Sequence, residues 1–242
     1  LCEKISAPFM LNKLVCKKYF EAQHLKLLRD DEIPMQTQFN LLLSGQTDHT
    51  FKDVSKQTKI ATAEWSWNAR FADLDNDQWQ DIYVTNGVPI TQEFAANNFF
   101  HNQKGQTFNS SAKEFGLDDY DHSSSYNYLD IDRDGDLDII ANTLYGSFKV
   151  YTNNESKNNS ITFKLRDKKG NRFCIGCRII ILYGKNGEKH QVREIKTGGG
   201  FHSHDAPIAH FGLETYKNIQ SIEIIWSTGE TSIIKYNFLA NH

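Results

Sequence analysis

Two short stretches of the chain concentrate carboxylates at a regular spacing. They read Asp-Leu-Asp-Asn-Asp-Gln-Trp-Gln-Asp over residues 73–81 and Asp-Ile-Asp-Arg-Asp-Gly-Asp-Leu-Asp over residues 130–138. Two carboxylates ~4 Å apart repel each other by ~4 kcal/mol at an effective dielectric of ~20, so four together need a cation. Side chains at positions 1, 3, 5 and 9 of a tight loop can project inward, and the carbonyl at position 7 can complete an oxygen cage. Such a set of hard oxygen ligands suits Ca²⁺, which takes about six to eight of them.

We therefore predict one Ca²⁺ site in each loop, with metal binding coupled to loop closure. EF-hands need a Glu at position 12, where Val84 and Ala141 stand here. Gly135 permits a sharp turn in the second loop, whereas Gln78 takes the corresponding place in the first. A solvated acidic turn is the alternative, and Mg²⁺ or Mn²⁺ is a less natural occupant. The expected ligands are Asp73, Asp75, Asp77, Trp79 (carbonyl) and Asp81 in the first loop, and Asp130, Asp132, Asp134, Asp136 (carbonyl) and Asp138 in the second.

The composition of the chain excludes several classes of protein. Its 242 residues, 39% hydrophobic and 24% charged, suit a folded protein of one or two domains. A net charge of −3 provides no bulk basic field for a nucleic acid. The sequence contains no run of eighteen apolar residues, so it predicts no membrane-spanning helix. The sequence begins at Leu1 without a basic and then apolar leader, so we expect any signal peptide to have been removed.

The segment from about 38 to 154 repeats itself. Short β-type runs follow each acidic loop, and about four strands in a repeat of this length are typical of one β-propeller blade. A propeller needs roughly four to eight blades to close, so we expect this chain to belong to a longer protein or to pair with a missing partner. The repeat is visible in Asn40, Phe51, Ile60, Asp73 and Asp81, which are followed 57 or 58 residues later by Asn98, Phe108, Leu117, Asp130 and Asp138.

Different patterns flank the repeat. Apolar residues at helical spacing predict an amphipathic helix over about 8–29. From about residue 160, strand runs alternate with turns, which predicts a compact antiparallel β domain after a polar boundary. The predicted fold is thus all-β: an N-terminal helical segment (1–34), two to three blades of a larger propeller (35–157) and a small C-terminal antiparallel β domain (158–242).

These motifs resemble a known combination of domains. The acidic loops, with their Asn-apolar and Thr-Phe lead-ins, look like FG-GAP/VCBS repeats of integrin-α-like β-propellers. The C-terminal part resembles the ASPIC/UnbV domain, which follows such propellers in secreted cartilage acidic protein-like proteins and in many bacterial surface proteins. Together the matches cover about 38–240. The C-terminal motifs are Asn171–Gly176, Gly198–Ser203, His210–Leu213 and Trp226–Gly229.

The resemblance implies a calcium-binding interaction or assembly module that is extracellular or displayed on the cell surface and is not an enzyme. Its partner would be a protein or glycan at the cell surface, which in a bacterium could belong to an outer-membrane uptake complex. A hydrolase or lyase acting on polysaccharide is the rival hypothesis, and a purely structural cap on a larger propeller is a third. The chain departs from the family pattern at Gln78, Cys174, Cys177 and Glu214.

Three other groups of residues have competing interpretations. Cys174 and Cys177 are expected to be buried thiols, with a Cys174–Cys177 or Cys2–Cys16 disulfide as the alternative. In a second group the histidines could form a transition-metal site, but a hairpin shaped by the glycines at 198–200 is the simpler interpretation. Aromatic residues before the two loops are expected in the core between blades rather than on a sugar-stacking surface. The second group is His202, Ser203, His204, Asp205 and His210, and the aromatic residues are Trp65, Trp67, Tyr126 and Tyr128.

Overall fold

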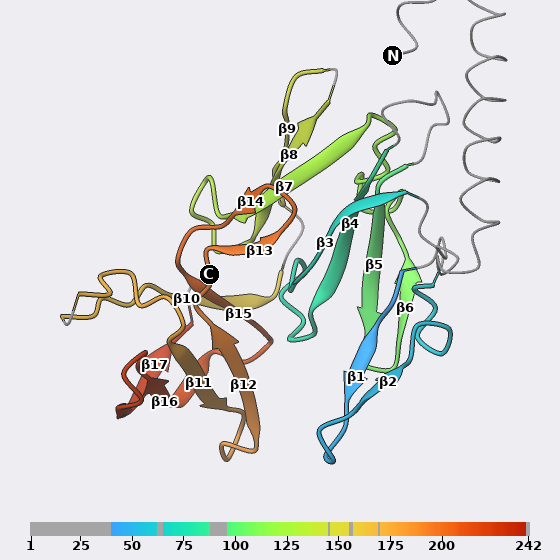
Figure 1. Ribbon diagram of the computed structural model, residues 1–242. Helices are drawn as coiled ribbons and strands as arrows, with labels where there is room; N and C mark the ends of the chain where they lie inside the picture. Colours follow the sequence, from blue (N-terminus) through green and yellow to red (C-terminus); the bar gives the residue numbers. More distant parts are fainter. Residues whose placement is uncertain are drawn as a thin grey trace, which may run out of the picture. The chain divides into compact units, whose positions relative to one another are not determined.

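A computed structural model describes residues 40–61, 65–87, 96–144, 146–154, 157–168 and 170–240, whose strands are shown in Figure 1. These residues belong to one of the two units into which the chain divides, Phe39–His242. Every regular element in the described ranges is a β-strand, so the predicted all-β class is confirmed. No helix in these ranges has the length and apolar character needed to cross a membrane. The helix predicted over about 8–29 lies outside the described residues.

The first full repeat forms a four-stranded antiparallel sheet in the order β3-β4-β5-β6. Strands that follow one another in sequence are neighbours in this sheet, which is the meander expected of a propeller blade. In the register of β3 and β4, Ala72 lies opposite Asp81, so the first acidic loop is the turn that joins these two strands. The strands are β3 (Ser66–Ala72), β4 (Asp81–Asn86), β5 (Asn98–Gln103) and β6 (Thr107–Ser110).

The second repeat forms a three-stranded meander of β7 (Ser123–Leu129), β8 (Asp138–Thr143) and β9 (Lys149–Tyr151). Leu129 lies opposite Asp138, so the second acidic loop occupies the same turn as the first. Before both sheets, β1 (Leu43–Gly45) and β2 (Phe51–Asp53) form a two-stranded sheet at the place of β5 and β6 in the repeat. None of the described sheets closes into a ring, as expected for part of a propeller.

The C-terminal part consists of three further sheets. Its largest sheet has the order β12-β11-β16-β17, and alternate residues of β11 are buried on one face. Strand β10 pairs with β15, and β13 pairs with β14 in a short hairpin. The strands are β10 (Asn159–Phe163), β11 (Arg178–Tyr183), β12 (Lys189–Glu194), β13 (Gly198–Gly200), β14 (Ser203–His204), β15 (Ala209–Glu214), β16 (Asn218–Ile225) and β17 (Thr231–Leu239).

Separate apolar cores hold the repeats and the C-terminal part. One core lies within the C-terminal part and includes Ile179 and Phe211. Another packs the first repeat against the second, with Tyr83 and Phe99 on one side and Tyr126 on the other. The buried Tyr126 and Tyr128 confirm the core interpretation for the second pair of aromatic residues. Trp65 contradicts it, because its side chain is 48% exposed beside the edge of β3.

Cys174 and Cys177 form a disulfide with their Cα atoms 5.4 Å apart. The expectation of buried thiols is therefore wrong, although both residues are indeed buried. A tight turn before β11 explains the pairing, because the Cys177 N–H donates to the Cys174 carbonyl at 3.0 Å and both side chains face the same core. Gly176, with a φ of 83°, permits this turn. The alternative pair, Cys2 and Cys16, lies outside the described residues.

Candidate metal sites at the two acidic loops

The first acidic loop is folded around the carboxylates at its ends. Asp73 Oδ2 accepts a hydrogen bond from the Gln78 N–H at 3.0 Å. Asp81 accepts one from the Leu74 N–H at 3.2 Å and one from the Asn102 N–H at 2.8 Å. Both aspartates are almost completely buried. The loop backbone therefore holds these two carboxylates inside the turn.

The second loop repeats this arrangement. Asp138 accepts hydrogen bonds from the Ile131 N–H at 2.6 Å and from the Asn153 N–H at 2.8 Å. Between the ends, the Asp136 N–H donates to Asp134 Oδ1 at 2.9 Å, and the Trp79 N–H of the first loop donates to Asp77 at 2.8 Å in the same way. The shared spacing thus produces the same local fold twice.

The two loops differ in which ligand atoms come together. In the second loop, carboxylate oxygens of Asp130, Asp132 and Asp138 lie within 4.8 Å of one another. In the first loop, the atoms that meet at this distance come from Asp75, Asp77 and His101. Five of the ten predicted ligands are therefore brought together directly. The other five, which flank these groups, are Asp73, Trp79, Asp81, Asp134 and Asp136.

The carboxylates are in an environment that disfavours their charge. Burial raises the pKa of Asp73 well above its ordinary value, and the charges of neighbouring aspartates raise it further. Burial also raises the pKa of Asp77 to about 6, and it raises the pKa values of Asp81 and Asp138. A bound cation would offset this penalty, because its charge favours the ionised carboxylates.

Two buried oxygen atoms point to the same need. Asp73 Oδ1 and Asp130 Oδ1, each from position 1 of its loop, have no hydrogen-bond partner in the structure. Buried acceptors are normally satisfied, and an unpaired one costs about 1–3 kcal/mol or more when charged. A divalent cation can take the place of the missing hydrogen-bond donor, because ionised carboxylate oxygens are hard ligands. The residues present therefore fit a hard divalent ion.

Two further residues complete the loops and were missed by the sequence analysis. The Asn102 amide donates to the Gln80 carbonyl at 2.8 Å, and that of Asn153 donates to the Leu137 carbonyl at 3.4 Å. Each asparagine thereby binds both its own loop and the last aspartate of that loop. The sequence contains a signal for them, because each asparagine stands two residues after an aromatic residue, in Phe-His-Asn and Tyr-Thr-Asn. Phe100 and Tyr151 hold equivalent places in the two ladders.

Strand β15 of the C-terminal part packs directly on the first loop. A Cβ atom at Gly212 would lie 2.5 Å from the Asn76 Cα and would also clash with the Asp73 carboxylate. The Glu214 N–H donates to the Asn76 carbonyl at 2.8 Å. The Gln78 amide donates to the Glu214 carboxylate at 2.5 Å. The two departures from the family pattern in this region, Gln78 and Glu214, are thus partners.

The second loop is held from the same side. His210 in β15 donates from Nε2 to the Gly135 carbonyl at 3.0 Å, and the Ser160 hydroxyl of β10 donates to that carbonyl at 2.6 Å. Burial lowers the pKa of His210 to about 4, so its ring is neutral near pH 7. The Asn76 amide donates to Asp136 Oδ1 at 2.6 Å and joins the loops to each other. Strand β15 therefore rests on both loops, and β10 rests on the second.

The cluster around His202 is explained by the hairpin of β13 and β14. The Asn68 amide donates to the Ser203 hydroxyl at 2.7 Å, and Asp205 forms an ion pair with Arg70. The paired glycine strand confirms the hairpin interpretation. Among the described residues, His202 and His204 join no group of ligand atoms that could hold a metal. The hairpin thus serves as a contact to β3 and β7.

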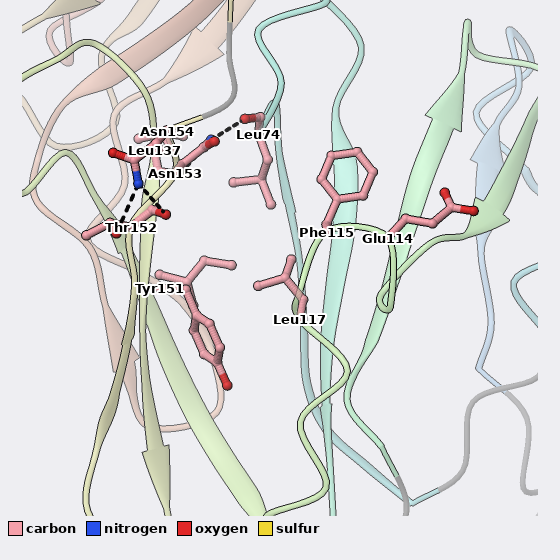
Figure 2. A pocket seen from close by; sticks show the side chains of 10 residues that line it. Leu74, Glu114, Phe115, Leu117, Leu137, Tyr151, Thr152, Asn153 and Asn154 are labelled. Atoms are coloured by element: carbon pink, nitrogen blue, oxygen red, sulfur yellow. Dashed lines mark hydrogen bonds between the residues drawn. The ribbon is translucent and has the colours of Figure 1, made fainter.

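A pocket of about 540 Å³ lies beside the loops, between the first and second repeats (Figure 2). Leu74 and Leu137 line it from the two loops, and Phe115 and Tyr151 line it from the two repeats. The Asn153 amide donates to the Leu74 carbonyl at 2.5 Å, so it links the first loop to the end of β9. The pocket walls near the loops are therefore mostly apolar, with hydrogen bonds at one side.

The chain is similar to known proteins in its C-terminal part and, more weakly, over most of its length. Residues 167–241 match the ASPIC and UnbV family model. The predicted resemblance of the C-terminal part is therefore confirmed. The chain is also 26% identical over 166 residues to cartilage acidic protein 1 of Homo sapiens and 24% identical over 197 residues to cartilage acidic protein 1 of Mus musculus. These alignments span 66% and 78% of this chain but only 24% and 30% of the relatives. The resemblance of the loops to FG-GAP/VCBS repeats stays a prediction.

Proposed function

We propose that this chain is an extracellular or cell-surface binding and assembly module, without catalytic activity, whose two acidic loops bind Ca²⁺. The observation that carries the proposal is the position of the loops beneath β10 and β15. Gly135 and Asn76 present their carbonyls to these strands from within the loops. A metal that fixes the loops would fix these carbonyls as well, and so would hold the C-terminal part against the repeats.

The carboxylates that would hold the ion are those predicted from the spacing. When bound, Ca²⁺ supplies charge neutralisation and a cross-link between the ends of each loop. The protein contributes the rest: Asn102 and Asn153 hold the last aspartate of each loop, and the loop backbone orients the others. The buried, unpaired oxygens of Asp73 and Asp130 support this assignment.

Several observations favour an extracellular location. The Cys174–Cys177 disulfide suits an oxidising compartment. Extracellular Ca²⁺ would fill sites even with Kd values of roughly 10⁻⁴–10⁻³ M. The ASPIC and UnbV match and the similarity to cartilage acidic protein 1 point the same way. The partner we propose is a protein or glycan at the cell surface. In a bacterium, this partner would belong to an outer-membrane uptake complex.

The enzymatic alternative, a hydrolase or lyase acting on polysaccharide, lacks a supporting observation among the described residues. Glycoside hydrolases commonly use a pair of carboxyl groups about 5–10 Å apart with distinct roles. Asp205, the carboxylate in the histidine-rich segment, is paired with Arg70. Ser203 is bonded to Asn68 and to the Phe201 carbonyl. These contacts assign both residues to the packing of the hairpin.

Equilibrium dialysis against Ca²⁺ tests the metal assignment. We expect one ion at the second loop and a further ion at the first when Ca²⁺ is in millimolar excess. Asp138→Asn should remove the ion of the second loop, because it deletes a charge at the point where the loop ends meet. Asp121→Asn, which changes an exposed carboxylate outside the loops, should leave the count unchanged. A chain that retains no Ca²⁺ under these conditions would contradict the proposal.

A further inference from the structure

The two acidic loops share their spacing but not the chemistry of the atoms that converge. The second loop brings together three carboxylates, whereas the first brings together Asp75, Asp77 and the ring of His101. His101 lies in β5, and its Nε2 is 2.9 Å from Asp75 Oδ2. The group at the first loop therefore contains one nitrogen atom, whereas the group at the second loop contains only oxygen atoms.

The His101 ring is held by a contact to its second nitrogen and by two neighbouring aromatic rings. Its Nδ1 lies 3.2 Å from the Gln103 amide, and its faces are beside Phe99 and Phe115, with ring centroids 6.2 Å and 5.5 Å away. A hydrogen bond to the second ring nitrogen fixes the orientation and tautomer of a metal-ligating imidazole. The Gln103 amide can present its oxygen to an Nδ1–H by rotating about its terminal bond. Nε2 is thereby directed at the two carboxylates.

The equivalent position in the second repeat carries no imidazole. Phe100 lies opposite Ile82, and Tyr151 lies opposite Ile139, so the residues that follow them, His101 and Thr152, are equivalent. Each is followed by the asparagine that binds the last aspartate of its loop. The hydrogen bonds next to this position are therefore matched in the two repeats, but only the first repeat carries an imidazole there.

We propose that the first loop, as a mixed nitrogen and oxygen site, prefers a divalent transition ion of the zinc type over Ca²⁺ when both are present, while the second loop is an all-oxygen site that prefers Ca²⁺. The inference rests on the proposed function of the loops as metal sites. Imidazole and carboxylate together suit Zn²⁺, whereas Ca²⁺ is bound through oxygen. Asp73 supplies independent support: it is 2% exposed, and its Oδ1 has no hydrogen-bond partner beside this group. Asp73 flanks the group of Asp75, Asp77 and His101, and its charge interacts with those of both aspartates, so it is the candidate for a fourth ligand.

The test is dialysis of the full chain against equal concentrations of Zn²⁺ and Ca²⁺, followed by measurement of both metals in the protein. The expected result is one Zn²⁺ and one Ca²⁺ per chain. His101→Thr, which copies the second repeat, should weaken Zn²⁺ binding by at least ~100-fold, since even residues that only orient a ligand contribute ~10–100-fold. His101→Gln should do the same while keeping a hydrogen-bonding group beside Asp75. His190→Thr, an exposed histidine elsewhere, should have no effect.

Nuclear magnetic resonance of the ring nitrogens provides a second readout. Zn²⁺ should shift the Nε2 resonance of His101, and Ca²⁺ alone should not produce a coordination shift. Two Ca²⁺ ions and no Zn²⁺, or Zn²⁺ binding that survives both His101 substitutions, would overturn the inference and leave the proposed metal-binding function intact. A chain that binds neither ion would overturn both.

Discussion

Replacement of Gly212 by alanine should lower the free energy of unfolding by about 3 kcal/mol or more. The added methyl group would meet the backbone of Asn76 at 2.5 Å and the Asp73 carboxylate. Overpacking of this kind costs about 1–3 kcal/mol where side chains can shift, and more where backbone must move. Urea denaturation in millimolar Ca²⁺ measures the change as a shift of the midpoint at constant slope.

Gly198 provides the matched control for this substitution. It lies in the C-terminal part, and a Cβ atom there would have no neighbour within 4 Å. Gly198→Ala should therefore change the stability by no more than about 0.5 kcal/mol. Equal effects of the two substitutions, or a Gly212→Ala chain with unchanged stability, would contradict the close packing of β15 on the first loop.

Removal of divalent metal should lower the melting temperature strongly. A ligand at 100 times its Kd stabilises a protein by about 2.7 kcal/mol per site, which corresponds to about 5–10 °C for a chain of this length. Scanning calorimetry in 10 mM Ca²⁺ and in excess chelator measures the difference. Asp138→Asn should abolish the part of this difference in melting temperature that is due to the second loop, and Asp121→Asn should leave the difference unchanged. Identical melting curves with and without chelator would contradict a structural role for the metal.

The pH dependence of the same curves has a definite sign. In the chelated chain, burial raises the folded-state pKa of Asp77 to about 6, above the unfolded value of 3.8. The ionised carboxylate therefore destabilises the folded state at pH 7, and this penalty is relieved as the pH falls through 6 toward 3.8. The aspartates should thus make the chelated chain more stable at pH 5.5 than at pH 7.5. In the Ca²⁺-loaded chain, protons compete with the metal and the trend should reverse.

His210 contributes the opposite slope and must be separated from the aspartates. Its folded-state pKa of about 4 lies below the unfolded value of 6.5, so its contribution is complete above pH 6.5 and is lost as the pH falls toward 4. His210→Gln keeps a side chain that can donate to the Gly135 carbonyl but removes this titration. The melting curves at pH 5.5 and pH 7.5 are therefore also compared in a chain that carries His210→Gln.

The loops were predictable because their chemistry is local. Asp73 to Asp81 span nine residues, so the ligand spacing is written directly in the sequence. His101 is different: it meets Asp75 only because β5 pairs with β4, and 26 residues separate the two. Asn102 and Asn153 were not recognised as equivalent for a related reason. Asn153 follows Asn102 by 51 residues rather than 57, since the segment between the second and third strands of the sheet is shorter in the second repeat.

Long-range packing explains the other differences from expectation. Gln78 stands where the second loop has a glycine that permits a sharp turn, but its amide binds Glu214, a residue 136 positions away in the chain. The Cys-x-x-Cys spacing allows thiols or a disulfide, and the turn that enters β11 decides between them. Trp65 was expected in the core between blades, but its side chain is half exposed immediately before β3.

The most direct measurement is anomalous diffraction from crystals of this chain grown with Ca²⁺. At the second loop we predict a single strong peak about 2.3–2.6 Å from oxygens of Asp130, Asp132 and Asp138, in a closed turn beneath His210. An open turn that holds only water at millimolar Ca²⁺ would contradict it.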